Sequence, residues 1–235
     1  MSYFFKSRSS FYSFLFTIPL FFVYEVSILF LSKDDIIVVR NGADFLMRNI
    51  LESFDIYGLY GLGFVFFFGF IFTFIFFLKN ESTREINSNF LFFMFIESVL
   101  WSFALYLMLS KFMLVLMNPT GKMILQQVTL AIGAGIYEEF LFRVLLIAGL
   151  ANILGFIFLW KQLARKIVAL IISGGIFSAF HFMGEYGDFF SMELFLLRFF
   201  AGIILGSLYL FRGFGITAYT HSIYDLIVLI RMTLV

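Results

Sequence analysis

The 235-residue chain has no cysteine, and only 13% of its residues are charged. The missing cysteine excludes disulfide bonds, thiolate nucleophiles, zinc–cysteine sites and iron–sulfur clusters. Intrinsic disorder is excluded because a disordered chain combines high charge with low hydrophobicity. Lysine and arginine number 16 against 15 aspartates and glutamates, so the chain lacks the excess of positive charge that is typical of nucleic-acid binding.

Hydrophobic residues make up 62% of the chain, and phenylalanine alone occurs 39 times. A soluble domain contains roughly 45–50% apolar and about 25% charged residues, so this composition excludes a soluble globular domain. A transmembrane helix needs about 20 mostly apolar residues to cross roughly 30 Å of hydrocarbon. Seven segments meet this condition: residues 11–31, 57–78, 90–109, 123–154, 167–183, 194–211 and 215–230.

These segments predict an all-α fold, a polytopic membrane bundle of seven or eight transmembrane helices with its polar site inside the bundle. The segment 123–154 is too long for one straight crossing, so we expect it to tilt, break or continue past the membrane. Residues 156–160 are expected to add a short interfacial segment or to help form an eighth span. Because the sequence has no repeat, linker or second domain, residues 1–235 are interpreted as one membrane domain, with a catalytic core at about 123–231.

Lys6 and Arg8 precede the first apolar segment, as positive residues do in a secretory signal. The segment is longer than a signal's apolar region, and no small-residue cleavage site follows it, so we interpret it as a retained anchor. Lysine and arginine are slightly more frequent in the loops on the side of the N-terminus, which predicts that this end faces the cell interior. Residues 42–54 predict either an interfacial amphipathic helix or a loop with a helical turn.

Ionisable side chains inside a membrane span cost at least about 2.5–3.5 kcal/mol each at the helix centre, so each one needs an explanation. We expect Glu25 and Glu97 to form hydrogen bonds between helices. Arg198 is expected to reach the interface or to pair with one of these two glutamates. The remaining ionisable residues in the predicted spans are Glu138, Glu139, Arg143, His181, His221 and Asp225.

Two adjacent carboxylates, Glu138 and Glu139, form the first notable unit. Glu139 and Arg143 are four residues apart, so they share one helix face and can pair. Glu138 is turned about 100° away and has no obvious partner in its own helix. A buried carboxylate in this setting is suited to proton transfer. The alternative is a charge cluster at a helix end whose side chains reach the interface.

The only two histidines form the other units: His181 follows Phe177 by one helical turn, and His221 precedes Asp225 by one turn. Each histidine taken alone is equally well explained as a hydrogen-bonded residue inside the bundle. Together with Glu138, however, the two units can form one polar pocket if the helices pack closely. Glycines permit such packing, and the candidates are Gly133, Gly135, Gly174, Gly175, Gly202, Gly213 and Gly215.

This combination of residues suits hydrolysis by an activated water. A carboxylate and an imidazole can deprotonate water and pass the proton to a leaving amine, while other donors stabilise the oxyanion. A serine mechanism through Ser173, Ser178 or Ser222 is an alternative. A zinc site of His181, His221 and a carboxylate is another, although the HExxH signature is absent.

Three motifs follow one another in apolar segments: Glu138-Glu139-x-x-x-Arg143, Phe177-x-x-x-His181 and His221-x-x-x-Asp225. This order resembles the CPBP family, which contains the type II CAAX prenyl endopeptidases (Rce1-like) and the bacteriocin-processing and self-immunity proteins (Abi family). The resemblance covers roughly residues 126–231. It implies a multi-helix membrane fold, a metal-independent protease and no cofactor.

By this resemblance Glu138 is the catalytic glutamate, and His181 helps it to activate water. His221 and Asp225 correspond to the catalytic pair that holds the oxyanion, while Glu139 and Arg143 are structural support. Asp225 departs from the asparagine of the eukaryotic-type prenyl proteases, although many prokaryotic relatives share the aspartate. An ionised aspartate would repel an oxyanion, so Asp225 must be protonated or must orient His221 instead.

The sequence therefore predicts an intramembrane endopeptidase in the plasma membrane of a prokaryote. Its expected partners are the lipid bilayer and a peptide or lipidated-protein substrate, with no nucleic acid. Two other classes stay open: a non-enzymatic bacteriocin immunity or scaffold protein on the same fold, and a proton-coupled carrier, since glutamates and histidines inside a bundle also occur in proton relays.

Overall fold

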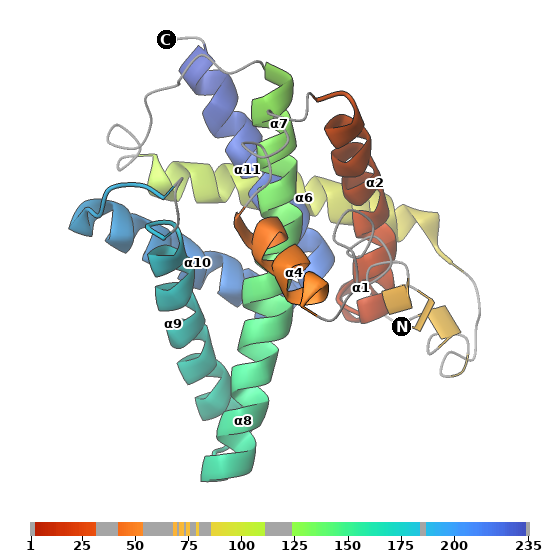
Figure 1. Ribbon diagram of the computed structural model, residues 1–235. Coiled ribbons are helices and arrows are strands. Elements are labelled where there is room, and N and C mark those ends of the chain that lie inside the picture. The colour runs from red at the N-terminus through yellow and green to blue at the C-terminus, as the bar shows by residue number, and fades with distance from the viewer. Residues whose placement is uncertain are drawn as a thin grey trace.

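The computed structural model describes residues 3–31, 42–53, 86–110, 124–183 and 187–233, and parts of 68–79. All regular structure in these ranges is helical, which confirms the predicted all-α fold (Figure 1). The helices are α1 (Tyr3–Ser7), α2 (Ser10–Leu29), α4 (Gly42–Glu52), α6 (Ser88–Leu109), α7 (Ile124–Gly133), η2 (Ala134–Glu138), η3 (Phe140–Ile147), α8 (Ala148–Phe158), α9 (Gln162–Phe180), α10 (Met192–Arg212) and α11 (Phe214–Thr233).

Five helices of the described ranges are long and apolar enough to cross a membrane: α2, α6, the continuous helix Ile124–Phe158, α9 and α10. The chain is thus an integral, multi-pass membrane protein. Helix α11 corresponds to the predicted span 215–230 and has the length of a span, but its many polar residues keep it out of this group. The predicted span 57–78 lies mostly outside the described residues.

The helix Ile124–Phe158 runs without interruption through α7, η2, η3 and α8 and contains 35 residues. At 1.5 Å per residue it is about 52 Å long, well beyond the roughly 30 Å of hydrocarbon. The predicted segment 123–154 therefore does not break, and its length requires that it tilts, continues past the membrane, or does both. Leu159 adopts a left-handed conformation with φ of 51° and turns the chain into α9. The expectation of an eighth span at 156–160 is therefore wrong, because these residues end α8 and form the turn.

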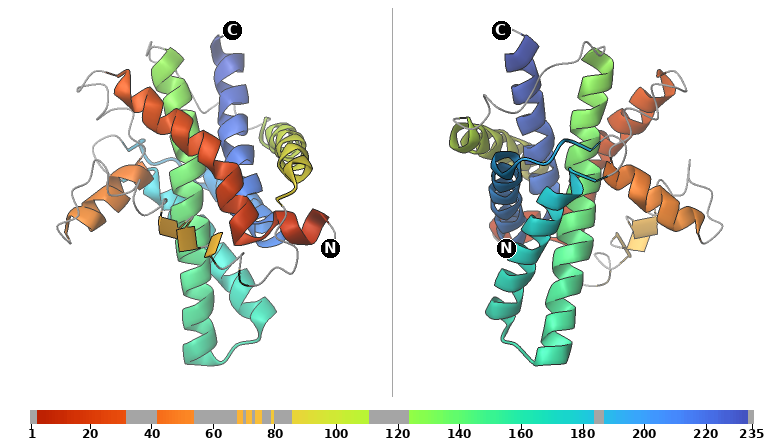
Figure 2. Two further views of the ribbon diagram at one scale, coloured as in Figure 1. Left: turned by 90° about the vertical axis from the view of Figure 1, so that its right-hand side faces the viewer. Right: turned by 60° about the vertical axis from the view of Figure 1, so that its left-hand side comes forward.

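Helix α11 occupies a central position, in contact with α6, α2, α7, η2 and α10. The left view of Figure 2 shows α2 crossing α7 on the outer side of the bundle. Helix α11 approaches the long helix closely at Gly135, where an added Cβ atom would lie 2.5 Å from the carbonyl oxygen of Ala218. The same Cβ would lie 2.8 Å from the backbone nitrogen of Ser222, so the two backbones touch.

The predicted glycine contacts are confirmed at six of the seven positions. Gly175 is the exception, since an added Cβ atom there would meet nothing within 4 Å. Helix α9 contacts α10 at Gly174, which lies against Gly202. The six confirmed positions are Gly133, Gly135, Gly174, Gly202, Gly213 and Gly215.

Candidate active site

The two adjacent glutamates lie where the long helix changes its hydrogen bonding. The segments η2 and η3 on either side of Glu139 are π-helical. A π-helix closes i→i+5 hydrogen bonds, so its turn is wider than that of an α-helix, and such segments occur frequently at functional sites. The apolar pattern of the sequence predicts only a helix here, and no residue type in it indicates the wider turn.

Glu139 lies at the centre of a buried chain of charged groups. Its side chain is fully buried, with Oε2 3.0 Å from Nε of Arg143 and Oε1 2.8 Å from Nδ1 of His221. Nε2 of His221 in turn lies 3.5 Å from Oδ2 of Asp225. The predicted i,i+4 pairs Glu139–Arg143 and His221–Asp225 are thus both formed, and Glu139 joins them by linking the long helix to α11.

His181 faces the other glutamate. Nδ1 of His181 is 2.8 Å from the carbonyl oxygen of Phe177, and because a carbonyl only accepts, Nδ1 carries a hydrogen and donates it. This hydrogen bond turns Nε2 toward Glu138, whose Oε2 lies 3.9 Å away. The His181 side chain is 25% exposed and that of Glu138 8%, so this pair lies closer to the molecular surface than Glu139 does.

Phe177 connects the two groups of residues. Its ring centroid is 4.9 Å from that of His181 and 6.4 Å from that of His221. The guanidinium carbon of Arg143 lies 4.5 Å from the same centroid, as in a cation–π contact. The structure therefore brings all six predicted residues into one site, formed by η2, η3, the end of α9 and α11.

Helix α4 is anchored beside this site by polar contacts that the sequence did not indicate. Asp44 accepts hydrogen bonds from Tyr24 and Arg48, and Arg48 also reaches Glu25 at 3.3 Å. Burial lowers the pKa of Arg48, but the charges of Asp44, Tyr137 and Glu25 together with the hydrogen bond to Asp44 raise this pKa overall. Glu25 also accepts from the hydroxyl of Tyr137, the residue before Glu138, at 2.9 Å. The predicted hydrogen bond of Glu25 between helices is therefore confirmed.

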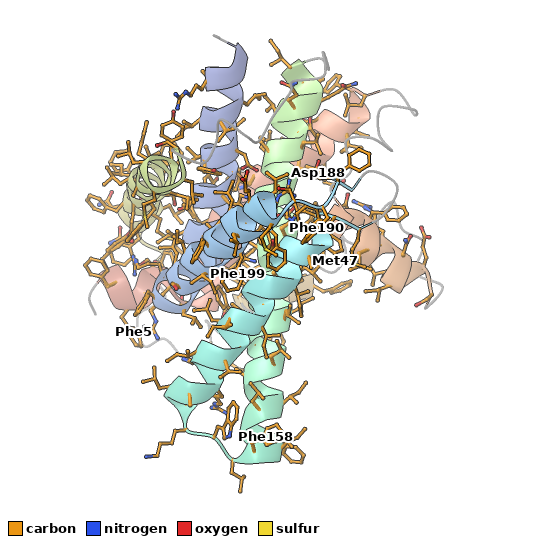
Figure 3. All side chains as sticks on the ribbon, turned by 90° about the vertical axis from the view of Figure 1, so that its left-hand side faces the viewer. Phe5, Met47, Phe158, Asp188, Phe190 and Phe199 are labelled. Atoms are coloured by element: carbon orange, nitrogen blue, oxygen red, sulfur yellow. The ribbon has the colours of Figure 1, made fainter. Side chains whose placement is uncertain are left out.

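Glu97 also bonds across helices, as predicted, because it accepts from Tyr3 at 2.8 Å and from Nη2 of Arg212 at 2.7 Å. The alternative in which Arg198 pairs with Glu25 or Glu97 is wrong, since its guanidinium pairs with Asp188; that Arg198 reaches the interface stays a prediction. The backbone nitrogen of Asp188 donates to the carbonyl oxygen of His181, which folds this segment back over the end of α9. Figure 3 shows Asp188 and Phe190 at this end of α9, opposite Phe158 at the other end of the α8–α9 pair.

Two of the three serines near the motifs are engaged elsewhere, whereas the hydroxyl of Ser222 is buried without a hydrogen-bond partner among the described residues. Ser173 donates to the carbonyl oxygen of Phe142 at 2.7 Å, and Ser178 donates to that of Phe195 at 2.6 Å. Neither hydroxyl is directed at a histidine, so the geometry gives no support to a serine nucleophile at these positions. The described ranges contain no cluster of three or more His, Asp or Glu side chains that could hold a metal ion.

Comparison with known protein families matches residues 120–227 to the type II CAAX prenyl endopeptidase Rce1-like family. This range includes every residue of the site described above. Comparison with curated proteins and with solved structures gives no significant match.

Proposed function

Residues 120–227 form a domain of the Rce1-like family, and from this premise we propose that the protein is a metal-independent intramembrane endopeptidase. In this proposal Glu138 and His181 activate a water that hydrolyses a peptide bond. One observation carries the proposal: Nε2 of His181, held in place by the carbonyl of Phe177, faces Oε2 of Glu138 across 3.9 Å. This distance is too long for a direct hydrogen bond, but a water oxygen can lie about 2.8 Å from both atoms.

The reaction then proceeds by general base and general acid catalysis. Glu138 takes a proton from the water, whose oxygen forms a bond to the carbonyl carbon of the substrate. The carbon–nitrogen bond then breaks, and the proton held by Glu138 passes to the leaving amine. His181 orients the water through Nε2, and the products are a carboxylate and an amine.

Glu139 is unsuited to this role although it is adjacent to Glu138. Both of its oxygens are engaged, one with Arg143 and one with His221, and the side chain is fully buried. In this proposal the ion pair with Arg143 and the contact with His221 occupy Glu139, so Glu138 is the carboxylate left to act on water. Glu139 is therefore assigned to holding His221, which extends its role beyond the support of its own helix.

His221 is the proposed oxyanion donor. Its Nδ1 is engaged with Glu139, so Nε2 is the nitrogen available to a substrate. Asp225 lies 3.5 Å from this nitrogen, which suits a residue that orients the imidazole. Because one N–H cannot donate to Asp225 and to an oxyanion at once, in this proposal Nε2 turns from Asp225 to the substrate as the negative charge develops, and Asp225 is then protonated.

The proposed substrate is a peptide segment of a membrane-associated or lipidated protein, because the site lies among membrane-embedded helices. The aspartate at position 225 favours a prokaryotic source and hence the plasma membrane. A substrate that approaches laterally from the bilayer would reach the more exposed pair, Glu138 and His181, first.

Purified protein in liposomes, incubated with a library of prenylated and plain peptides, tests this proposal by mass spectrometry. We expect cleavage of a subset of peptides at a rate that a strong chelator leaves unchanged. Cleavage that the chelator abolishes would contradict the metal-independent mechanism. Cleavage that His181→Ala leaves at the wild-type rate would contradict the assignment of the Glu138–His181 pair.

A further inference from the structure

A cavity of about 380 Å³ lies apart from the candidate active site, where the N-termini of α2 and α9 meet the C-terminus of α10. Three cationic side chains line it together with polar groups, and no aspartate or glutamate is among the described residues of the lining. The polar lining residues include Arg8, Arg165, Lys166, Gln162, Asn152 and Tyr209. A volume of this size accommodates a small ligand or a headgroup.

The three cations are not paired with an acidic side chain in the part of the chain that the structure describes. Within the described part of the chain, neither Arg8, Arg165 nor Lys166 forms an ion pair, and Nε of Arg165 is buried without a hydrogen-bond partner. Gly155 lets the Arg165 guanidinium lie directly on α8, since an added Cβ atom there would be 2.2 Å from Nη1. A buried donor without a partner is costly, so this arrangement favours an external acceptor at the cavity.

The backbone adds to this preference for an anion. Helix α9 begins at Gln162, a lining residue, and no side chain caps its first turn. Its 19 residues give it a full helix dipole, whose positive end and free N–H groups point toward the cavity.

The position of the cavity matches the headgroup layer of a membrane. Segments 3–10 and 159–166, which end at the cavity, contain lysine and arginine but no aspartate or glutamate. Beside them the turn between α8 and α9 exposes apolar residues, with Phe156 at 87% and Leu159 at 86%, and it contains Trp160. Aromatic residues flanked by cations are typical of the membrane–water interface.

We propose that this cavity binds a phosphate-bearing anion, supplied either by the headgroup of an anionic phospholipid or by a free phosphate compound. Phosphate oxygens would accept from Arg165, Lys166 and the first turn of α9, which satisfies the unpartnered donors. The proposal depends on the cavity alone and is independent of the peptidase activity.

Native mass spectrometry of the full-length protein in detergent tests the proposal with three probes. These are phosphatidylglycerol, phosphatidylcholine and, as the soluble phosphate, pyrophosphate. We expect phosphatidylglycerol to bind more tightly than phosphatidylcholine, and Arg165→Gln to weaken its binding about five- to tenfold, as expected for one cation at the membrane surface. Lys161→Gln is the matched control, because Lys161 lies in the same turn but does not line the cavity.

The outcomes distinguish the sources of phosphate. Pyrophosphate binding that is lost in Arg165→Gln and retained in Lys161→Gln would support the anion site and identify its ligand as a soluble phosphate. Equal weakening by both variants would indicate general surface charge and overturn the proposal, as would the absence of any anion preference. Lys166→Gln provides a second variant of the cavity, and a melting curve of each variant shows that it is folded.

Discussion

Replacing Glu138 with glutamine is expected to abolish peptide cleavage while the protein stays folded. The amide keeps the shape of the side chain but cannot accept a proton from water, and the loss of a general base typically lowers a rate by about 10²–10⁴-fold. The rate should be measured in liposomes on a peptide that the wild type cleaves, together with the melting temperature in detergent.

Glu193→Gln is the matched control, because Glu193 is an exposed glutamate at the start of α10 and lies outside the site. It should cleave at the wild-type rate. If Glu138→Gln retained most of the activity, Glu138 would not be the base, and the role assigned to the Glu138–His181 pair would be wrong.

Replacing Gly135 with alanine should cause a large loss of stability. The new methyl group would lie 2.5 Å from the carbonyl oxygen of Ala218, which is backbone and cannot move aside as a flexible side chain does. Helix α11 must then shift as a whole and carry His221 away from Glu139. We expect a loss of about 3 kcal/mol or more in the free energy of unfolding, at the upper end for overpacked sites, and little remaining cleavage.

Gly175→Ala isolates the steric effect, because Gly175 is also helical but has open space around it. There the alanine should leave stability unchanged or raise it by roughly 0.5–1 kcal/mol, since alanine suits a helix better than glycine. Thermal melting of both variants in detergent provides the comparison. Similar melting temperatures for the two would show that the contact between α11 and η2 is not tight.

The spacing of residues along the sequence predicted the contacts of the site that form within a single helix. Glu139 and Arg143, like His221 and Asp225, are four residues apart, so helix geometry alone brings each pair together. The contact between Glu139 and His221 joins residues 82 positions apart and depends on how α11 packs at Gly135. Because the sequence alone does not show this packing, only the role of supporting its own helix could be predicted for Glu139.

The helices themselves were predictable because each apolar segment must be about as long as the hydrocarbon is thick. The π-helical turns around Glu139 could not be predicted, because they depend on packing and no residue type indicates them. The partner of Arg198 was missed for a related reason. Asp188 reaches Arg198 only because its segment folds back on the carbonyl of His181, and the sequence gives no signal for this fold.

The most direct test of the central claim compares Glu138→Gln with Glu139→Gln, measuring cleavage rate and melting temperature for both. The account predicts that Glu138→Gln loses cleavage and keeps the wild-type melting temperature. Glu139→Gln should instead lose about 3–5 kcal/mol of stability, because Arg143 is then buried without its counter-charge. The opposite pattern, with an inactive but stable Glu139→Gln and an active Glu138→Gln, would contradict the division of roles between the two carboxylates.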